Sequence, residues 1–424
     1  MSSTAVAPIA ITTRDDMRKP RILFVAESVT LAQVVRLAKL AHDLKAEPYE
    51  LHFAASSFPE LAFSELPVQR WPLFTLEPDR VFSALDRGKR IYEKRLLKRY
   101  VAADLEVIDS VKPSLIVGDF RLSLATSAAL RGIPHATLIN AYWSPYAVRE
   151  RFPVPDHPIV KLLGLEMASR YFPQAMPKVF AHFAKPINDT RRSFGLTAIG
   201  SLQDVLVYGD YTLYADTPTI TPTAQLPEHH RYLGPVVWSP AVALPELPTG
   251  DRPLIYVTLG SSGKVEVLPS VLSALARLPV RVLLATAGRA APQLPDNVTA
   301  RDFVPGDQAA RRAHLTITNG GSATGYQALA EGCPVLGVAS NLDQYLTMDA
   351  IERSGAGRLL RAGGLNAEQV THAVEHMLGD SGYKQRAAAV AADFARWDSA
   401  ARFRAFVAEV VAGQAGVAAS QASS

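Results

Sequence analysis

The sequence predicts an α/β protein with two Rossmann-like domains, each built on a parallel sheet, that face each other across a cleft. The chain has 424 residues, which is more than one ordinary hydrophobic core accommodates. Short apolar runs alternate with helical stretches in two separate series along the chain, as in βαβ units. A proline-rich segment lies between the two series and marks the junction of the domains.

The composition is that of a globular protein with sizeable cores, because 48% of the residues are hydrophobic and 20% are charged. The net charge of +4 suits an anionic ligand but does not by itself indicate nucleic-acid binding. Cys333 is the single cysteine, which rules out an intrachain disulfide and favours a reducing compartment. No basic region precedes the apolar patch near the N-terminus, and no apolar run approaches the roughly 18 residues that span a bilayer. We therefore expect a cytoplasmic protein.

The first series of elements follows residues 1–19, which we expect to be a flexible leader. Its first strand is RILFVA, residues 21–26, a continuous apolar run typical of a buried parallel strand, and a helix is expected over 31–44. Further strands are expected at 49–56, 113–119 and 134–140, with a helix up to residue 131 between the last two. These elements predict an N-terminal Rossmann-like domain over residues 20–215.

Prolines are frequent over residues 216–252, which favours an extended interdomain linker. The second series then defines a C-terminal Rossmann-like domain over 253–396, with strands expected in PLIYVTLGSSG, VRVLLATAG, VTARDFVPG, HLTITNGG, PVLGVAS and AGRLLRAGG. A last helix is expected over 397–412, and a disordered tail over 413–424.

The segment TNGGSATG, residues 318–325, combines a strand end, a glycine turn and a helix start. Gly320 and Gly321 permit a tight turn and the close approach of a ligand. Ser322 is expected to be the N-cap, and the backbone N–H groups from Ala323 onward would combine with the helix dipole to bind an anion. A capped helix without any ligand is the alternative interpretation of this pattern.

Two neighbouring segments favour the ligand. Ser261 and Ser262 follow the first strand of the second series, at the carboxyl end where open α/β sheets bind ligands. Asp343 and Gln344 follow a later strand, and such a pair can hold vicinal hydroxyls because a carboxylate accepts hydrogen bonds and an amide both donates and accepts them. Asp343 is alternatively the N-cap of the next helix.

Together these residues resemble the inverting GT-B glycosyltransferases of the UDP-glycosyltransferase type, glycosyltransferase family 1, in its bacterial branch. That family carries His-Gly-Gly, Ser or Thr, Ala-Leu, Gly-x-Pro and Asp-Gln in this order. The resemblance spans nearly the whole chain and is most specific over residues 302–344. The matching positions here are Asn319-Gly320-Gly321-Ser322, Ala328-Leu329, Gly332-Cys333-Pro334 and Asp343-Gln344, with Phe303-Val304-Pro305 and Tyr232-Leu233-Gly234-Pro235 upstream.

The resemblance implies a GT-B fold and a UDP- or dTDP-sugar as co-substrate. It assigns the pyrophosphate to Ser261 and the glycine turn, the base to Val304, and the sugar hydroxyls to Asp343 and Gln344. Asn319 stands where the family usually has His, and an amide carries no positive charge to stabilise the leaving group. The expected donor-binding residues are Ser261, Ser262, Val304, Asn319, Gly320, Gly321, Ser322, Ala323, Thr324, Asp343 and Gln344.

The resemblance also implies a catalytic His after the first strand, but a gap-free match places Gln33 there, and an amide is no base. Asp119 matches the Asp that orients the family's His. Three interpretations remain open. Another carboxylate, Glu27 or Asp119, replaces the His; the acceptor arrives already ionised, as a carboxylate or an acidic phenol; or the protein binds the donor without catalysing transfer. Glu27 is alternatively a cap of the first helix.

We expect the acceptor pocket in the N-terminal domain near residues 140–158, an irregular stretch rich in aromatic residues after a strand end. The same aromatic side chains would also suit a core under a long loop. Two arginines of this stretch could pair with an anionic acceptor or face water. The expected acceptor-binding residues are Tyr142, Trp143, Tyr146, Arg149 and Phe152.

We expect no metal and no further cofactor, because the chain has no Asp-x-Asp motif and the pair His372 and His376 has no third ligand nearby. Residues 89–99 hold six basic residues against one acid, Glu93, which permits association with an anionic membrane but is more often a solvated helix face. The sequence thus predicts an inverting glycosyltransferase that acts on a small, partly apolar or acidic acceptor. The alternatives are an auxiliary nucleotide-sugar-binding protein and a nucleotide-sugar epimerase.

Overall fold

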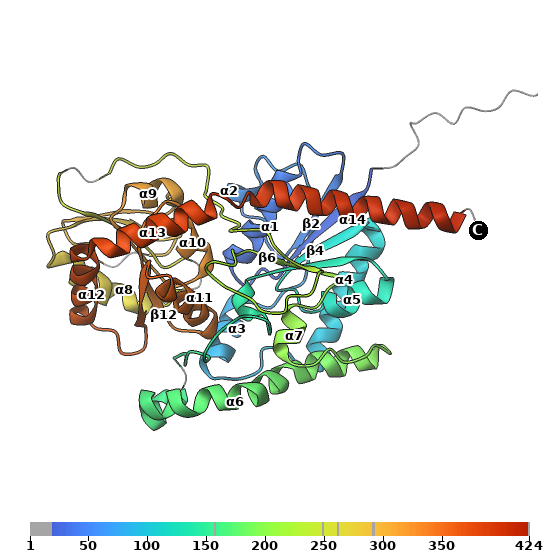
Figure 1. Ribbon diagram of the computed structural model, residues 1–424, viewed down its shortest axis with the longest axis horizontal. Helices are drawn as coiled ribbons and strands as arrows, with labels where there is room; N and C mark the ends of the chain where they lie inside the picture. The colour runs from blue at the N-terminus through green and yellow to red at the C-terminus, as the bar shows by residue number, and fades with distance from the viewer. Residues whose placement is uncertain (1–18, 157, 248–249, 261–262, 291–292, 423–424) are drawn as a thin grey trace, which may run out of the picture.

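The computed structural model describes residues 19–156, 158–247, 250–260, 263–290 and 293–422 of the chain. Figure 1 shows two α/β units side by side, with one long helix along one edge of the molecule and another along the opposite edge of the N-terminal unit. The first unit holds a seven-stranded sheet in the order β3-β2-β1-β4-β5-β6-β7, and the second holds a six-stranded sheet in the order β10-β9-β8-β11-β12-β13. Every ladder of named strands is parallel, which confirms the predicted α/β architecture of two Rossmann-like domains.

The N-terminal domain contains the elements of the first series. In chain order they are β1 (Arg21–Ala26), α1 (Leu31–Asp43), β2 (Glu50–Ala55), α2 (Glu60–Phe63), β3 (Gln69–Pro72), α3 (Pro78–Asp86), α4 (Lys94–Val111), β4 (Leu115–Asp119), α5 (Leu124–Arg131), β5 (His135–Ile139), η2 (Ala141–Trp143), α6 (Pro158–Ser193), α7 (Leu202–Leu206), β6 (Tyr211–Tyr214) and β7 (His230–Tyr232).

The C-terminal domain contains the second series, and each strand expected there from an apolar run is present. Its elements, followed by the last helix of the chain, are β8 (Leu254–Thr258), η3 (Val265–Val267), α8 (Leu268–Ala276), β9 (Arg281–Ala285), β10 (Val298–Arg301), α9 (Gly306–Arg312), β11 (Leu315–Thr318), α10 (Ser322–Ala330), β12 (Val335–Ala339), α11 (Leu342–Arg353), β13 (Gly357–Arg361), α12 (Ala367–Gly379), α13 (Ser381–Phe394) and α14 (Ser399–Ala422).

Strand β1 illustrates why these apolar runs become central strands. Ile22 and Phe24 point to one face of the sheet, where they join the core formed with α1 and α14. Leu23 and Val25 point to the opposite face and pack with side chains of α4 and α5. Because both faces of the sheet are covered, successive residues of the strand are all apolar rather than alternating.

The N-terminal sheet extends further along the chain than the domain boundary expected at residue 215. Strand β7 lies within the segment expected to be linker, and its residues pair with β6 through Thr212 and His230. A strand of three residues is too short to show a periodic pattern, and several prolines lie near it. The composition of this segment therefore predicted a linker. The connection to the C-terminal domain therefore begins after Tyr232.

The last helix, α14, belongs to the core of the N-terminal domain although it follows the C-terminal domain in sequence. Figure 1 shows it, in red, running along the N-terminal domain after the chain has crossed over from the C-terminal domain. Phe403, Phe406 and Val407 are buried with Phe24 of β1 in one apolar cluster. The helix continues to Ala422, so the disordered tail expected from residue 413 is wrong for the residues described. The reason is that alanine favours helix strongly enough to offset the interspersed Gly and Ser.

Helix α6 was not expected from the sequence and has 36 residues. Pro173, Pro177 and Pro186 lie inside it, and these prolines interrupt the pattern that normally predicts a helix. Gly164, with φ 76°, kinks the helix near its start. Figure 1 shows α6 running along the edge of the N-terminal domain, with its first half directed toward the C-terminal domain. No described helix is both long enough and apolar enough to cross a membrane.

Candidate functional site

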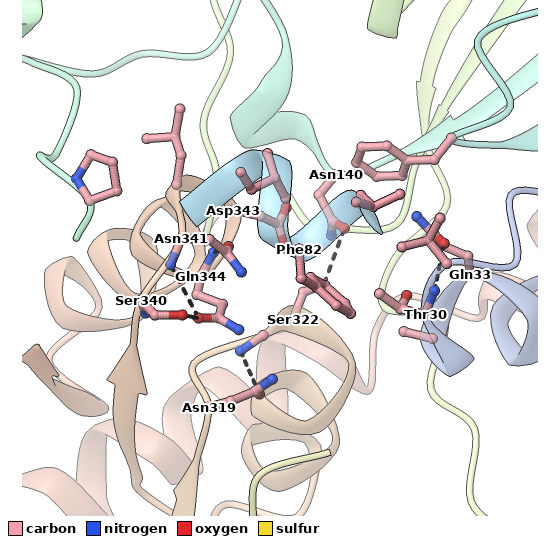
Figure 2. A pocket seen from close by; sticks show the side chains of 18 of the residues that line it. Thr30, Gln33, Phe82, Asn140, Asn319, Ser322, Ser340, Asn341, Asp343 and Gln344 are labelled. Carbon is pink, nitrogen blue, oxygen red and sulfur yellow. Dashed lines mark hydrogen bonds between the residues drawn. The ribbon is translucent and has the colours of Figure 1, made fainter. Parts of the chain in front are cut away.

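A cavity of about 850 Å³ lies between the two domains and is lined by residues of both. The carboxyl ends of the central strands of each sheet meet there, which is where open α/β sheets bind ligands. Figure 2 shows Thr30 and Gln33 of the N-terminal domain on one side of this space and Asn319, Ser322 and Gln344 of the C-terminal domain on the other. The predicted cleft is therefore a defined cavity.

The glycine turn after β11 opens the N-terminus of α10 into this cavity. Gly321 rather than Ser322 is the N-cap, and no side chain caps the helix. The first helical hydrogen bond runs from Gly325 N to Gly321 O, so the N–H groups of the first helical residues have no carbonyl partner within the helix. Ser322, Ala323 and Thr324 line the cavity, so their amides lie where the sequence predicts an anion.

Gly320 makes the turn possible by its own conformation. Its φ is 79°, in the left-handed region that side chains disfavour, and a Cβ there would lie 2.9 Å from Met348 Cγ. The hydroxyl of Ser322, which the sequence suggested as a cap, instead donates to Asn140 Oδ1 of the other domain over 3.2 Å. The serine thus bridges the domains instead of closing the helix end.

Asn319 is buried at the start of the turn and lines the cavity. Its Oδ1 accepts a hydrogen bond from Gly321 N at 3.2 Å. This bond fixes the turn, a role that a neutral amide performs without carrying charge. At this position the turn therefore offers backbone N–H groups, and not a cation, to the anion that the sequence predicts.

Gln344 helps to cap helix α11 through its side-chain oxygen, while its side-chain N–H₂ group has no hydrogen-bond partner. Asn341 is the N-cap of α11, and Gln344 completes the capping box, so Asp343 is not the cap. Gln344 Oε1 accepts from Ser340 N at 2.8 Å, while Nε2 is buried with no hydrogen-bond partner. The side chain lines the cavity, and its N–H₂ group has no hydrogen-bond partner, as expected for a residue predicted to donate to a ligand hydroxyl.

Asp343 faces the N-terminal domain across the cavity. Its Oδ1 accepts from Trp143 Nε1 at 2.7 Å and from the Tyr142 hydroxyl at 3.2 Å. Burial raises the pKa of Asp343, an effect that Trp143, Arg36 and Tyr142 oppose. The carboxylate therefore connects the two domains at the place where the sequence predicts sugar hydroxyls.

Most of the expected donor-binding residues line one continuous wall of the cavity. Gly320 lies behind this wall, and Ser261 and Ser262 fall outside the described residues. The lining members are Val304, Asn319, Gly321, Ser322, Ala323, Thr324, Asp343 and Gln344.

Gln33 serves as a helix cap. Thr30 is the N-cap of α1, and the backbone N–H of Thr30 donates to Gln33 Oε1 at 3.1 Å, which completes a capping box. The side chain also lines the cavity. The amide at the position of the family's His is thus explained by local helix structure.

Asp119 is fully buried at the end of β4 and forms a two-point ion pair with Arg36 of α1. Arg36 Nη2 and Nε donate to its two oxygens at 2.8 and 3.0 Å. Burial raises the pKa of Asp119 to about 6, against the opposing effect of Arg36. Arg36 lines the cavity and Asp119 does not, so the carboxylate orients the guanidinium. Arg36 Nη1 in turn donates to Asn140 Oδ1 at 2.7 Å.

Glu27 follows β1, lines the cavity and is held by three side chains. Arg121 Nη1 donates to Oε2 at 3.1 Å, and the hydroxyls of Tyr100 and Tyr92 donate to Oε1 at 2.8 and 3.3 Å. Because Thr30 caps α1, Glu27 is not the helix cap. Burial raises the pKa of Glu27, while Arg121 and Tyr100 lower it.

Only Trp143 of the five expected acceptor residues lines the cavity. Tyr142 is 3% exposed and points to Asp343. Tyr146 packs its ring against His230. Arg149 lies over the Phe152 ring and donates to the carbonyls of Tyr142 and Ser144, and burial lowers its pKa to about 10. Four of the five side chains therefore pack outside the cavity: Tyr142 is buried in the core, and the other three are half-buried.

The apolar wall of the cavity comes from helices α3 and α6, which the sequence reasoning missed. The wall is continuous because α6 passes the mouth of the cavity over several turns. A run of aromatic residues at helical spacing between residues 171 and 183 was the available signal. The wall includes Phe82, Tyr171, Phe172, Met176, Phe180 and Phe183.

Within the described residues, no group of three or more His, Cys, Asp or Glu side chains is placed to hold a metal ion. His372 and His376 stack on α12 with ring centroids 6.4 Å apart.

Comparison with known proteins identifies the family of this chain. Residues 269–402 match the family described as "Erythromycin biosynthesis protein CIII-like, C-terminal domain". A "PGL/p-HBAD biosynthesis rhamnosyltransferase" of Mycobacterium bovis is 47% identical over 385 residues, 89% of this chain and 85% of the relative. A "PGL/p-HBAD biosynthesis glycosyltransferase" of Mycobacterium tuberculosis is 46% identical over 383 residues, 89% of each chain. The chain belongs to this family of GT-B glycosyltransferases.

Solved structures support the fold. The spinosyn rhamnosyltransferase SpnG, 19% identical, covers 91% of this chain and 99% of its own with a TM-score of 0.65. It has also been solved with spinosyn aglycone and with thymidine diphosphate.

Membership in this family makes the chain a glycosyltransferase and confirms the expected enzyme class. The names of these two relatives favour transfer of a sugar over the auxiliary and epimerase alternatives.

Proposed function

We propose that this glycosyltransferase transfers rhamnose from a dTDP-sugar to a hydroxyl of an elongated, largely apolar acceptor, with inversion at the anomeric carbon. The observation that carries the proposal is the arrangement of the cavity. The anion-binding turn at Ser322 and the polar pair Asp343 and Gln344 form one wall, and the aromatic wall from α3 and α6 forms the other.

The polar wall suits a nucleoside diphosphate sugar. The amides at the start of α10 would bind the pyrophosphate, and Val304 would contact the base. Gln344 Nε2 and the Asp343 carboxylate would bind hydroxyls of the sugar. The choice of rhamnose and of dTDP draws support from the name of the relative that is 47% identical and from the thymidine diphosphate complex of SpnG.

The aromatic wall suits an acceptor with an extended apolar part. Phe172, Met176 and Phe180 would enclose it over several helical turns. An acceptor hydroxyl beside Trp143 would lie between the two walls, opposite the departing phosphate, which is the in-line arrangement that inversion requires. Holding both substrates in one orientation supplies several kcal/mol of the rate enhancement in general.

For the general base we propose Glu27. Of the two carboxylates that the sequence suggested, Glu27 lines the cavity and Asp119 does not. A carboxylate with a raised pKa is a stronger base than an ordinary one, and burial has this effect on Glu27. Arg121, already paired with Asp104 at 2.8 Å, would remain charged when Glu27 takes a proton.

The test is a transfer assay with purified protein, dTDP-rhamnose and a series of 4-alkylphenols of increasing chain length. UDP-glucose and UDP-rhamnose serve as competing donors. Release of dTDP should require the acceptor, and kcat/KM should rise with chain length by up to about fourfold per methylene while the chain fills the apolar wall. The anomeric configuration of the product, determined by NMR, should be opposite to that of the donor.

The donor, the acceptor class and the stereochemistry are each tested by a separate result of this assay. Preference for a UDP-sugar would overturn the donor, indifference to chain length would overturn the acceptor class, and retention at the anomeric carbon would overturn the mechanism. Release of dTDP without acceptor would indicate hydrolysis instead of transfer.

A further inference from the structure

The first half of α6 presents large apolar side chains to solvent. Within ten residues five such side chains are exposed, with exposed fractions of 82% for Leu162 and 43–48% for the others. Single exposed apolar residues are common on protein surfaces, but a group on one short stretch indicates a binding surface. We call Leu162, Leu163, Leu165, Met167 and Tyr171 the apolar patch.

The apolar patch is continuous with the cavity. Leu163 and Tyr171 belong to both, because each is partly exposed and each also lines the cavity. Phe172 and Met176 continue the same apolar surface inward along α6. A molecule bound on the patch would therefore lie next to the acceptor wall of the cavity.

A basic segment lies beside α6. Residues 87–99 carry seven exposed Lys and Arg side chains against one exposed acid, Glu93. Arg90 Nε donates to His182 Nε2 of α6 at 2.9 Å, and Tyr92 packs with Ala184 and Ile187 of the same helix. The basic side chains are Arg87, Lys89, Arg90, Lys94, Arg95, Lys98 and Arg99.

We propose that the apolar patch and the basic segment together dock this enzyme on the surface of an anionic lipid bilayer. Exposed leucine side chains enter the boundary between headgroups and acyl chains, and neighbouring cations are attracted to anionic headgroups. The predominantly basic charge along the second half of α6, on the same helix as the patch, favours a lipid surface over an uncharged partner. The helix lies on the membrane and does not span it, in agreement with the absence of a spanning helix among the described residues.

Docking places the mouth of the cavity at the bilayer surface. An acceptor with an apolar part would then pass from the lipid phase along Leu163 and Tyr171 to the aromatic wall. This passage of the acceptor from the lipid phase to the cavity rests on the proposed acceptor class. Docking on the bilayer does not rest on it, because vesicle binding is measured without donor or acceptor.

The test is co-sedimentation of the full chain with vesicles of phosphatidylcholine alone or mixed with phosphatidylglycerol. We expect pelleting with the mixed vesicles at low salt, and weaker pelleting at high salt because salt screens the basic segment. The double variant Leu162→Asp/Leu165→Asp should abolish pelleting. Val265→Asp, which changes an apolar residue exposed by 44% on the other domain, should leave it unchanged.

A second pair of variants separates the contribution of charge. Arg87→Gln/Lys94→Gln should weaken partitioning by about fivefold for each charge removed. Arg312→Gln/Lys384→Gln removes the same charge from exposed positions of the C-terminal domain and should have little effect. None of the substituted residues lines the cavity, so transfer to a short, water-soluble phenol should remain at the level of the unaltered enzyme.

Three results would overturn the proposal. The first is that the unaltered chain does not pellet with anionic vesicles at low salt. The second is that Arg87→Gln/Lys94→Gln and Arg312→Gln/Lys384→Gln weaken vesicle binding equally. The third is that Leu162→Asp/Leu165→Asp still pellets. A concentration-dependent dimer that this double variant dissociates, without vesicle binding, would instead identify the patch as a self-interface. Loss of transfer activity with normal pelleting would leave the docking in place and count against the proposed function alone.

Discussion

The indole N–H of Trp143 donates to Asp343 Oδ1 at 2.7 Å, so a residue expected to bind the acceptor contacts one expected to bind the sugar. The two side chains come from different domains and are 200 positions apart in the chain. Tyr142 donates to the same oxygen, and Thr347 donates to the Tyr142 hydroxyl at 3.0 Å. The contact between the domains and the position of the carboxylate that we propose to bind the sugar are therefore linked through one oxygen atom.

From this contact we expect Asp343→Asn to reduce kcat/KM for the sugar donor by about 10- to 100-fold, the cost of losing a charged hydrogen bond. Binding of free dTDP should change by less than about threefold, because the pyrophosphate contacts lie at α10. Isothermal titration with dTDP and steady-state kinetics with the sugar conjugate separate the two effects. Equal losses in both would contradict the assignment of Asp343 to the sugar.

Trp143→Phe tests the domain contact without touching the carboxylate. The variant retains the ring and loses the N–H donor, so we expect a loss of about 1 kcal/mol in the free energy of unfolding. The KM for the donor should rise while kcat changes less, because Asp343 is less well positioned. A normal KM with normal stability would mean that the contact is dispensable.

Glu27→Gln should lower kcat by about 10²–10⁴-fold, the usual contribution of general base catalysis. In the unaltered enzyme kcat/KM should rise with pH through the raised pKa of Glu27, because only the ionised carboxylate accepts the proton, and Glu27→Gln should remove this limb. The melting temperature and dTDP affinity report whether the buried site remains intact. Activity that stays unchanged in Glu27→Gln would point to an acceptor that arrives already ionised.

Asn319→Asp adds a negative charge to the turn with almost no change in shape, and its carboxylate can still accept from Gly321 N. If the pyrophosphate binds there, affinity for dTDP should fall by about tenfold or more, because each unfavourable charge contact costs on the order of 1.4 kcal/mol or more. Binding measured over a range of salt concentrations should show the difference shrinking as screening increases. Unchanged affinity would place the pyrophosphate elsewhere.

Local features of the sequence predicted the glycine turn and most of the residues that line the polar side of the cavity. Strands such as β1 and β12 are continuous apolar runs, and the turn at Gly320 depends on residues adjacent in the chain. The hydrogen bonds at Asp343 and the pairing of Arg36 with Asp119 join segments far apart, and no periodic pattern reports such contacts. Helix α6 was missed because its internal prolines mask its apolar face.

Phe403→Ala tests the assignment of α14 to the N-terminal core. Phe403 is fully buried and its ring centroid lies 6.1 Å from that of Phe24 in the central strand. Truncation leaves a cavity and should cost about 3–5 kcal/mol of unfolding free energy. Phe194→Ala, at a position 37% exposed, is the matched control and should cost far less. Denaturant titration of both variants measures these changes in the free energy of unfolding. Equally small changes in the two variants would mean that α14 is only loosely attached.

The buried His230 makes a specific prediction about stability and pH. Its Nδ1 lies 2.7 Å from the Tyr214 hydroxyl, and burial lowers its pKa to about 4. Between about pH 6.5 and pH 4 the unfolded chain binds the proton and the folded chain does not, so this residue makes the free energy of unfolding fall as the pH falls. The full effect is about 3 kcal/mol, from about 1.36 kcal/mol for each unit of the shift.

His230→Gln should therefore lose less stability than the unaltered chain on acidification from pH 7 to pH 4, although it starts from a lower value because the bond to Tyr214 is weakened. Urea unfolding at several pH values gives the two slopes directly. His372→Gln, at an exposed position on α12, is the control and should follow the unaltered chain. Parallel curves for all three proteins would mean that His230 gains a proton as readily in the folded chain as in the unfolded one.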